Sequence, residues 1–224
     1  MIETLTDDLQ FHLDELEEHI AIASDRIKAY YRGEGPPDDF PAYEVPPHQQ
    51  MLNRGISAVE FAFDYEAEGV RKLTTDWSVR DFEYSHLGVG LDLILQGIFL
   101  KCSPNRFLEK LEDNNGKTPN YSAARNHLLG VLSVEYSDQK EQIRLTLAVI
   151  RKHRNNSVHL GVHDVHHKSV IISSYEVAGY LISQYSEDNL ELVRRIRQYR
   201  KQAQEDNYYH WHPPEHPLPL EMPD

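Results

Sequence analysis

The sequence predicts an all-α protein, folded as a helical bundle. Apolar residues recur at steps of three and four along most of the 224 residues, and no two segments alternate as paired strands would. A chain of this length can bury a sizeable core as one domain. We expect helices at about 5–31, 48–73, 77–101, 104–113, 121–134, 138–155, 174–186 and 188–206.

The first predicted helix, 5–31, is amphipathic and is followed by a linker. Its apolar residues recur at nearly heptad spacing, so it packs either on its own core or against a partner helix; they are Leu5, Leu9, Leu13, Leu16, Ile20, Ala23, Ile27 and Tyr30. Five prolines exclude a helix interior from 34–47. We therefore divide the chain into an N-terminal amphipathic helix (1–33), a Pro-rich linker (34–47), a helical domain (48–206) and a Pro-rich irregular tail (207–224).

The stretch 87–100 is apolar on nearly all sides, which predicts the central and most buried helix. Asp92 and Gln96 are its polar breaks, four residues apart on one face. A carboxylate in such surroundings needs a partner, because burying an unpaired charge is costly. Further along, residues 161–169 look like a His-rich loop, and 170–172 fit either a strand or the start of a helix.

Charge and cysteine content suggest a cytoplasmic protein. The net charge is −13, yet residues 101–201 carry 16 basic and 11 acidic side chains, so a basic middle lies between acidic ends. The single cysteine, Cys102, excludes an internal disulfide framework and fits a reducing compartment. The sequence contains no run of eighteen apolar residues that would predict a membrane span, and the acidic start Met1–Thr4 is unlike a signal peptide.

The strongest candidate for a functional site is the segment Arg154-Asn155-x-x-x-His159, at the end of the predicted helix 138–155. Arginine followed by histidine at one fixed spacing arises by chance in a chain with this many of both, and Arg80-x5-His86 is a rival match. The context favours the later site, because a polar residue follows Arg154 and a strongly apolar helix ends some fifty residues upstream.

Here the chain resembles the HEPN superfamily, over about residues 48–186. The resemblance rests on Arg154, Asn155 and His159, which fit that family's Arg-x4–6-His motif, and on the order of the preceding helices. Asp92 is similar to a frequent acidic position of the family's core helix. One subset, paired with a nucleotidyltransferase antitoxin, has a Tyr two residues after the His; here Gly161 holds that place, so that type of partner is not supported.

The resemblance implies a metal-independent endoribonuclease of a toxin or antiviral defence system, with no cofactor. Such proteins usually form homodimers in which two motifs build one composite site, and a cognate antitoxin or defence protein is a conceivable further partner. Other members are non-catalytic and bind RNA or a partner protein, so that function stays open for this chain.

Elementary chemistry gives the three motif residues distinct roles. His159 can exchange protons near neutral pH, and Arg154 can hold phosphate oxygens in a fork. On a regular helix, Arg154 and His159 lie about 140° and about 7.5 Å apart, whereas Asn155 and His159 share a face. We therefore expect Asn155 to orient the imidazole or a phosphate. The structural alternative is that Arg and His in a last helical turn only stabilise the helix through its dipole and have no catalytic role.

Three other features have simpler explanations. The histidines around the predicted loop could bind a metal, which makes a metal-binding bundle a further alternative, but a solvated loop is favoured; they are His159, His163, His166, His167, His210 and His212. The basic run 194–201 could hold RNA, although a solvated face is favoured by the nearby Glu187, Asp188 and Glu191. Tyr208, Tyr209 and Trp211 could stack on bases, but more often such aromatics fix a tail.

Overall fold

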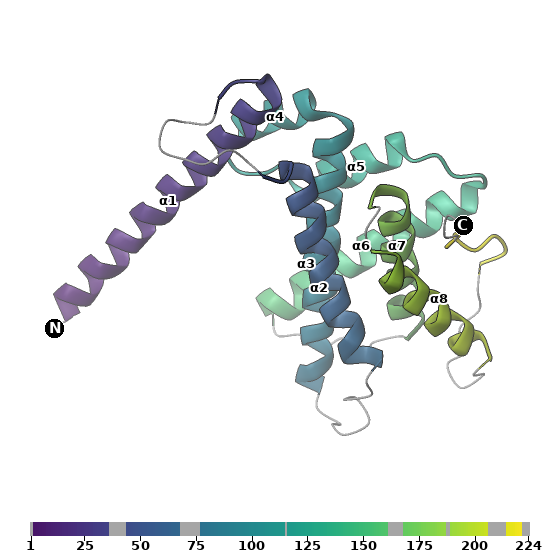
Figure 1. Ribbon diagram of the computed structural model, residues 1–224. Helices are drawn as coiled ribbons and strands as arrows, with labels where there is room; N and C mark the ends of the chain where they lie inside the picture. The colour runs from purple at the N-terminus through teal and green to yellow at the C-terminus, as the bar shows by residue number, and fades with distance from the viewer. Residues whose placement is uncertain are drawn as a thin grey trace.

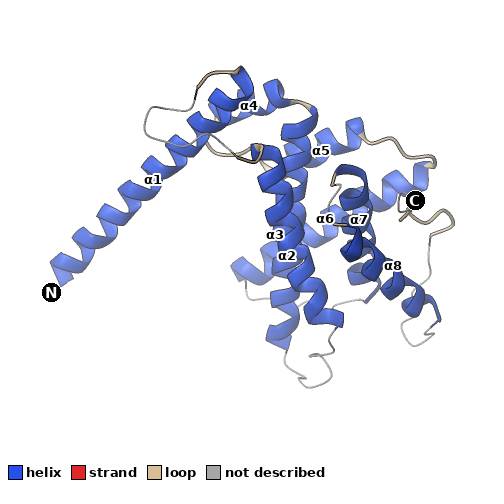
Figure 2. Ribbon diagram, viewed as in Figure 1, coloured by secondary structure: helices blue, strands red, loops and turns tan. Residues whose placement is uncertain are grey.

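The computed structural model describes residues 2–35, 44–67, 77–114, 116–160, 168–186, 189–205 and 214–220, with the backbone alone for 2–9, 66–67, 77–82, 156–160 and 168. Over these residues the chain forms eight helices and no strand, which confirms the predicted all-α fold (Figures 1 and 2). The helices are α1 (Ile2–Arg32), α2 (Pro47–Ala67), α3 (Trp77–Cys102), α4 (Pro104–Asp113), α5 (Tyr121–Val131), α6 (Ser137–Leu160), α7 (Lys168–Tyr185) and α8 (Leu190–Glu205).

Two predicted boundaries were wrong in ways that matter for function. Helix α6 continues to Leu160, five residues beyond the predicted 155, so the whole motif segment is helical and forms the last turns of α6. Helix α7 begins at Lys168, which makes 168–169 helix and not loop, and the ambiguous 170–172 are helical too. Ile171 and Ile172 are buried there, so tertiary packing outweighs the strand propensity of these β-branched residues.

Helices α2 and α3 run side by side through the middle of the molecule (Figure 1). They approach so closely because glycines face each other across the contact. A Cβ on Gly55 would lie 2.7 Å from the carbonyl oxygen of Gly90, and a Cβ on Gly90 would lie 2.8 Å from that of Gly55. Gly97 contributes similarly, since a Cβ there would lie 2.8 Å from Cγ of Leu52. Side chains at these positions would push the two helices apart.

The expectation that 87–100 is the central helix is confirmed. Most of the described apolar side chains of α3 are buried, with Val89 exposed, and α3 contacts α2, α5, α6 and α7, so α3 is the element around which the bundle packs. The fully buried members are Leu87, Leu91, Ile94, Leu95, Ile98 and Leu100.

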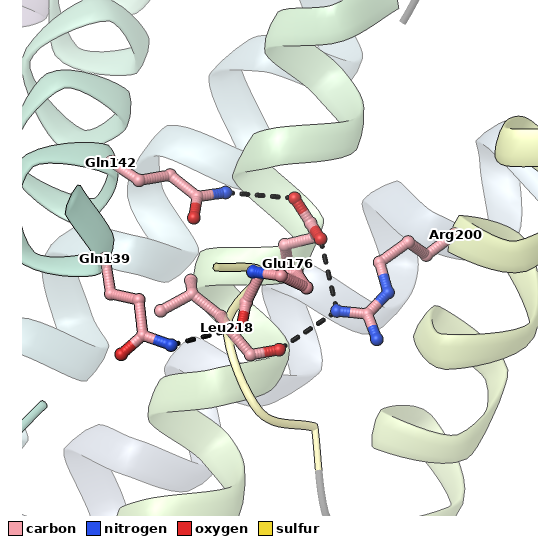
Figure 3. A network of polar contacts seen from close by, with 6 residues as sticks. Gln139, Gln142, Glu176, Arg200 and Leu218 are labelled. Carbon is pink, nitrogen blue, oxygen red and sulfur yellow. Dashed lines mark hydrogen bonds and ion pairs between the residues drawn. The ribbon is translucent and has the colours of Figure 1, made fainter. Parts of the chain in front are cut away.

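The two ends of the chain behave differently. Helix α1 contacts the body near its C-terminal end, through α4, and its N-terminal part extends away from the bundle (Figure 1). The tail residues 214–220 have no helix, as predicted, but they lie on the body with Leu218 and Leu220 buried. Arg200 donates to the Leu218 carbonyl at 3.0 Å and Gln139 to the Pro217 carbonyl at 3.1 Å, which fixes the tail on α6 and α8 (Figure 3).

Candidate functional site

Arg154 lies across α3 at a position where α3 has no side chain. A Cβ on Gly88 would lie 3.2 Å from both Cβ and Cδ of Arg154, so a side chain at position 88 would require Arg154 to shift by a few tenths of an ångström. Its Nη1 then lies 3.7 Å from Oδ2 of Asp92, one turn further along α3. The side chains of Arg154 and Asp92 are 34% and 27% exposed, so the pair sits at the surface of the bundle and solvent reaches it.

The charge and the hydrogen-bonding capacity of the Asp92 carboxylate are only partly satisfied by its neighbours. Burial raises the pKa of Asp92, while the Gln96 side chain and the charges of Arg154 and Arg151 act in the opposite direction. Its Oδ1 is buried without a hydrogen-bond partner among the described residues. The amide nitrogen of Gln96 donates to the Pro119 carbonyl at 2.7 Å. The expectation that this carboxylate has a partner is confirmed, and the partner is Arg154.

A second arginine is held one turn earlier on α6. Arg151 donates through Nη1 to the hydroxyl of Ser122 at 2.6 Å, and its guanidinium lies 4.9 Å from the ring centroid of Tyr121. The Tyr121 hydroxyl donates in turn to the Leu147 carbonyl at 2.7 Å. The start of α5 therefore positions Arg151, by stacking and by a hydrogen bond.

Four charged side chains gather around the Tyr121 phenol. Burial raises the pKa of Tyr121 and the charge of Asp92 raises it further, whereas Arg125, Arg151 and Arg154 lower it. This cluster combines three guanidinium groups with one carboxylate, and it joins α3, α5 and α6. We call Asp92, Arg125, Arg151 and Arg154 the arginine cluster. Its excess positive charge favours a ligand with phosphate groups.

The structure places the three predicted motif residues on one helix. Arg154 belongs to the arginine cluster, and Asn155 is half-buried beside it on α6. The backbone of His159 lies in the last turn of α6, and its side chain lies outside the described part of the chain. The convergence of imidazole and guanidinium therefore stays a prediction. In the rival match, the His86 ring lies 5.2 Å from the Phe61 ring, and the Arg80 side chain is outside the described part.

Sequence reasoning missed Arg125, Arg151, Tyr121 and Ser122. Arg151 carried a usable signal, because it lies three residues before Arg154 and therefore on the same helical face. The Tyr121–Ser122 pair carried none, since its approach to Arg151 depends on how α5 packs against α6.

Arg194, Arg195 and Arg200 of the basic run on α8 form ion pairs with carboxylates. Arg194 pairs with Glu191, Arg195 with Asp64 and Glu60, and Arg200 with the buried Glu176. These arginines stabilise the bundle, which agrees with the non-functional interpretation favoured from the sequence. The aromatic residues Tyr208, Tyr209 and Trp211 lie outside the described residues.

A separate cavity of about 550 Å³ lies between α1, α2, α3 and α4. Ile27, Met51, Leu93 and Leu111 give it apolar walls, and Arg54 and Lys117 also line it. No member of the arginine cluster lines this cavity, so the predicted chemistry and this cavity are in different places.

The part of the chain that the structure describes contains neither a candidate metal site nor a single membrane-spanning helix. Its His, Cys, Asp and Glu residues form no group of three that could hold a metal ion, while His163, His166, His167, His210 and His212 fall outside it. No single helix there is both long and apolar enough to cross a membrane; α3 and α4 reach that length and apolarity only together, across a bend of 119°.

The chain matches no protein-family model, no curated protein and no solved structure. Its function is therefore inferred from the arginine cluster and from the motif itself.

Proposed function

We propose that this protein is a metal-independent endoribonuclease of a toxin or antiviral defence system, which acts in the cytoplasm as a homodimer. The observation that supports the proposal is the arginine cluster. Arg154, a motif residue, is partly exposed beside Asp92, and Arg151 is held one turn earlier on α6 by Ser122 and Tyr121. The charge of Arg125 acts on Tyr121 together with theirs. Three guanidinium groups opposite a single carboxylate suit a backbone that carries one phosphate per nucleotide.

The reaction is transesterification within RNA. The 2′-oxygen forms a bond to phosphorus while the bond from phosphorus to the 5′-oxygen breaks. An imidazole takes the proton of the 2′-hydroxyl, and an imidazolium gives a proton to the departing 5′-oxygen, which leaves a 2′,3′-cyclic phosphate and a 5′-hydroxyl. Arg154 neutralises the charge on the non-bridging oxygens.

One chain offers one motif histidine, whereas the reaction needs an acid and a base. Two copies related by a twofold axis would supply His159 twice, one imidazole for each proton transfer. Asn155, four residues before His159 on the same helical face, would orient the ring or a phosphate oxygen. Arg125 and Arg151 would bind phosphates on either side of the cleaved bond.

The second candidate is a non-catalytic module that binds RNA or a partner protein. The contact between Arg154 and Gly88, together with the Asp92 ion pair, favours it, because both give Arg154 a role in joining α3 to α6. Such a protein would keep the arginine cluster for binding and would use no histidine.

Incubation of purified protein with mixed RNA in excess EDTA tests the two functions. We expect cleavage to 2′,3′-cyclic phosphate ends, reduced about 10²- to 10⁴-fold in His159→Ala and in Arg154→Ala. Arg144→Ala is the matched control, because Arg144 is on the same helix and pairs with Glu141 at an exposed position. Its activity should equal that of the wild type.

The possible results separate the alternatives. Undiminished cleavage in both Arg154→Ala and His159→Ala would remove the site assignment. RNA binding that depends on Arg151 and Arg154, without any cleavage by the wild type, would support the module. Zinc that co-purifies, and is lost in His163→Ala, would support a metal-binding bundle.

A further inference from the structure

Helix α1 exposes large apolar side chains on the part that extends from the bundle. Leu13 and Leu16 are each 55% exposed and Ile20 is 39% exposed. Ile27 and Ala29, nearer the C-terminal end of α1, are buried against the body. Figure 1 shows the N-terminal part of α1 with no helix beside it. Exposing leucines on a projecting helix is costly, so this face needs a cover.

The exposed residues follow a heptad register. Leu13, Leu16, Ile20 and Ala23 are spaced by three, four and three residues, which places them alternately at positions a and d, and the buried Ile27 holds the next a position. Leu9, four residues before Leu13, holds the preceding d position. Isoleucine at a and leucine at d is the combination that favours two parallel strands, and here Ile20 is at a while Leu9 and Leu16 are at d.

Charge in α1 is kept away from this seam. Apart from Glu17 at e, the acidic residues between 10 and 25 lie at b, c and f, on the far side of the helix; they are Asp14, Glu15, Glu18 and, nearer the body, Asp25. The g and e positions beside the seam carry His12 and Glu17. In a parallel pair, g of one helix faces the following e of the other, so His12 would face Glu17. An antiparallel pair would set the histidines His12 and His19 of the two copies against each other.

We propose that α1 pairs with α1 of a second copy of this chain, in parallel and in register, as a two-stranded coiled coil over about residues 6–23. The seam complements itself, with like a and d residues facing each other and His12 facing Glu17 of the second copy. A lipid surface is a poorer occupant, because α1 carries eight acidic and three basic residues and membranes are commonly anionic. The inference does not rest on nuclease activity.

Sedimentation of the full chain gives the first test. We expect a species of about twice 26.1 kDa at micromolar concentration, and a dimer dissociation constant raised about a hundredfold or more in Leu13→Ala/Leu16→Ala. Alanine preserves helix propensity, so α1 stays helical in this variant. Phe11→Ala is the matched control: Phe11 is 59% exposed, similar to Leu13, but lies at f, opposite the seam. Its dissociation constant should stay at the wild-type value.

Disulfide trapping gives the second test and shows whether the two α1 helices pair in parallel or antiparallel. In a Cys102→Ser background, Leu9→Cys and Leu16→Cys should each form a covalent dimer, since a parallel pair brings equal residues together at every d position. An antiparallel pair can do so at only one position. A strictly monomeric wild type, a failure of either cysteine to cross-link, or an equal effect of Phe11→Ala would overturn the proposal. Monomers that bind anionic vesicles through Leu13 and Leu16 would overturn it as well.

The two proposals can fail separately. If His159→Ala forms the α1 dimer but no RNA is cut by any variant, the nuclease is refuted and the coiled coil stands. If Leu13→Ala/Leu16→Ala is still a dimer and still cuts RNA, and the α1 cysteine variants fail to cross-link, the nuclease stands and the twofold contact lies elsewhere.

Discussion

Replacing Arg200 by methionine should expose the energetic cost of a buried carboxylate. Glu176 on α7 is 1% exposed, and its Oε1 lies 3.2 Å from Nη1 of Arg200, which is itself 15% exposed. The other carboxylate oxygen accepts from the Gln142 amide at 3.0 Å (Figure 3). In Arg200→Met, Glu176 keeps only the neutral amide.

The expected loss is large for one side chain. Removing one partner of a buried ion pair costs roughly 3–5 kcal/mol, and the partial exposure of Arg200 points to about 3 kcal/mol. The lost hydrogen bond to the Leu218 carbonyl adds about 1 kcal/mol and frees the tail. The double variant Glu176→Met/Arg200→Met should recover most of the first loss, because no charge is then buried.

The penalty should depend on pH with a definite sign. Burial raises the pKa of Glu176 above its ordinary 4.5, and Arg200 and Gln142 oppose that rise. Without Arg200 the pKa in the folded state rises further. A carboxyl whose folded pKa lies above its unfolded pKa destabilises the fold as pH rises through the folded value. The gap between wild type and Arg200→Met should therefore narrow as pH falls from neutrality towards 4.5.

Urea unfolding followed by circular dichroism at several pH values measures this gap. Arg144→Met is the control, since the Arg144–Glu141 pair is exposed and its loss should leave the unfolding midpoint close to that of the wild type. A cost below about 1 kcal/mol at neutral pH, or a gap that widens on acidification, would refute the assignment of Glu176 as a buried charge held by Arg200.

Two further predictions concern α3. Gly90→Ala should destabilise the fold by about 1–3 kcal/mol in urea unfolding, because the new Cβ would meet the backbone of α2. Gly130→Ala on α5 has nothing within 4 Å of its Cβ and should instead stabilise by about 0.5–1 kcal/mol, so equal effects at both glycines would contradict the close α2–α3 contact. Asp92→Asn should release Arg154 from its ion pair. In a His159→Ala background, the slope of log affinity for single-stranded RNA against log salt concentration should then become steeper by about 0.7, as measured by fluorescence anisotropy. An unchanged slope would mean that Arg154 does not contact phosphate.

The pattern of apolar residues was sufficient to predict the fold class and its central helix. Helix periodicity is a local property, and α3 stands out because its last turns are apolar nearly all round and present almost no polar face. The extension of α6 to Leu160 was not predictable in the same way. The residues from Asn155 to His159 are mostly polar, and nothing local distinguishes a last helical turn from a first loop residue.

The site was predictable only as far as one helix reaches. Arg154 and Arg151 share a face of α6, and that relation follows from their spacing. Asp92 could be predicted to need a partner, but not to find it in Arg154, sixty-two residues away, because that contact requires the gap that Gly88 leaves in α3. A glycine within an apolar run carries no sign of which side chain will fill its place.

The basic middle of the chain shows why net charge alone predicts a site poorly. Of the arginines in residues 101–201, Arg194, Arg195 and Arg200 on α8 are paired with carboxylates of α8 itself, α2 and α7, so their charge is neutralised locally. The charges of Arg151 and Arg154 act on Asp92, and burial disfavours the charged form of that carboxyl group. The positive potential that remains is thus concentrated where α5 and α6 meet α3, although α8 carries more arginines. A polyanion attracted to the protein should be sensitive to Arg151→Ala and indifferent to Arg194→Ala, whatever reaction follows.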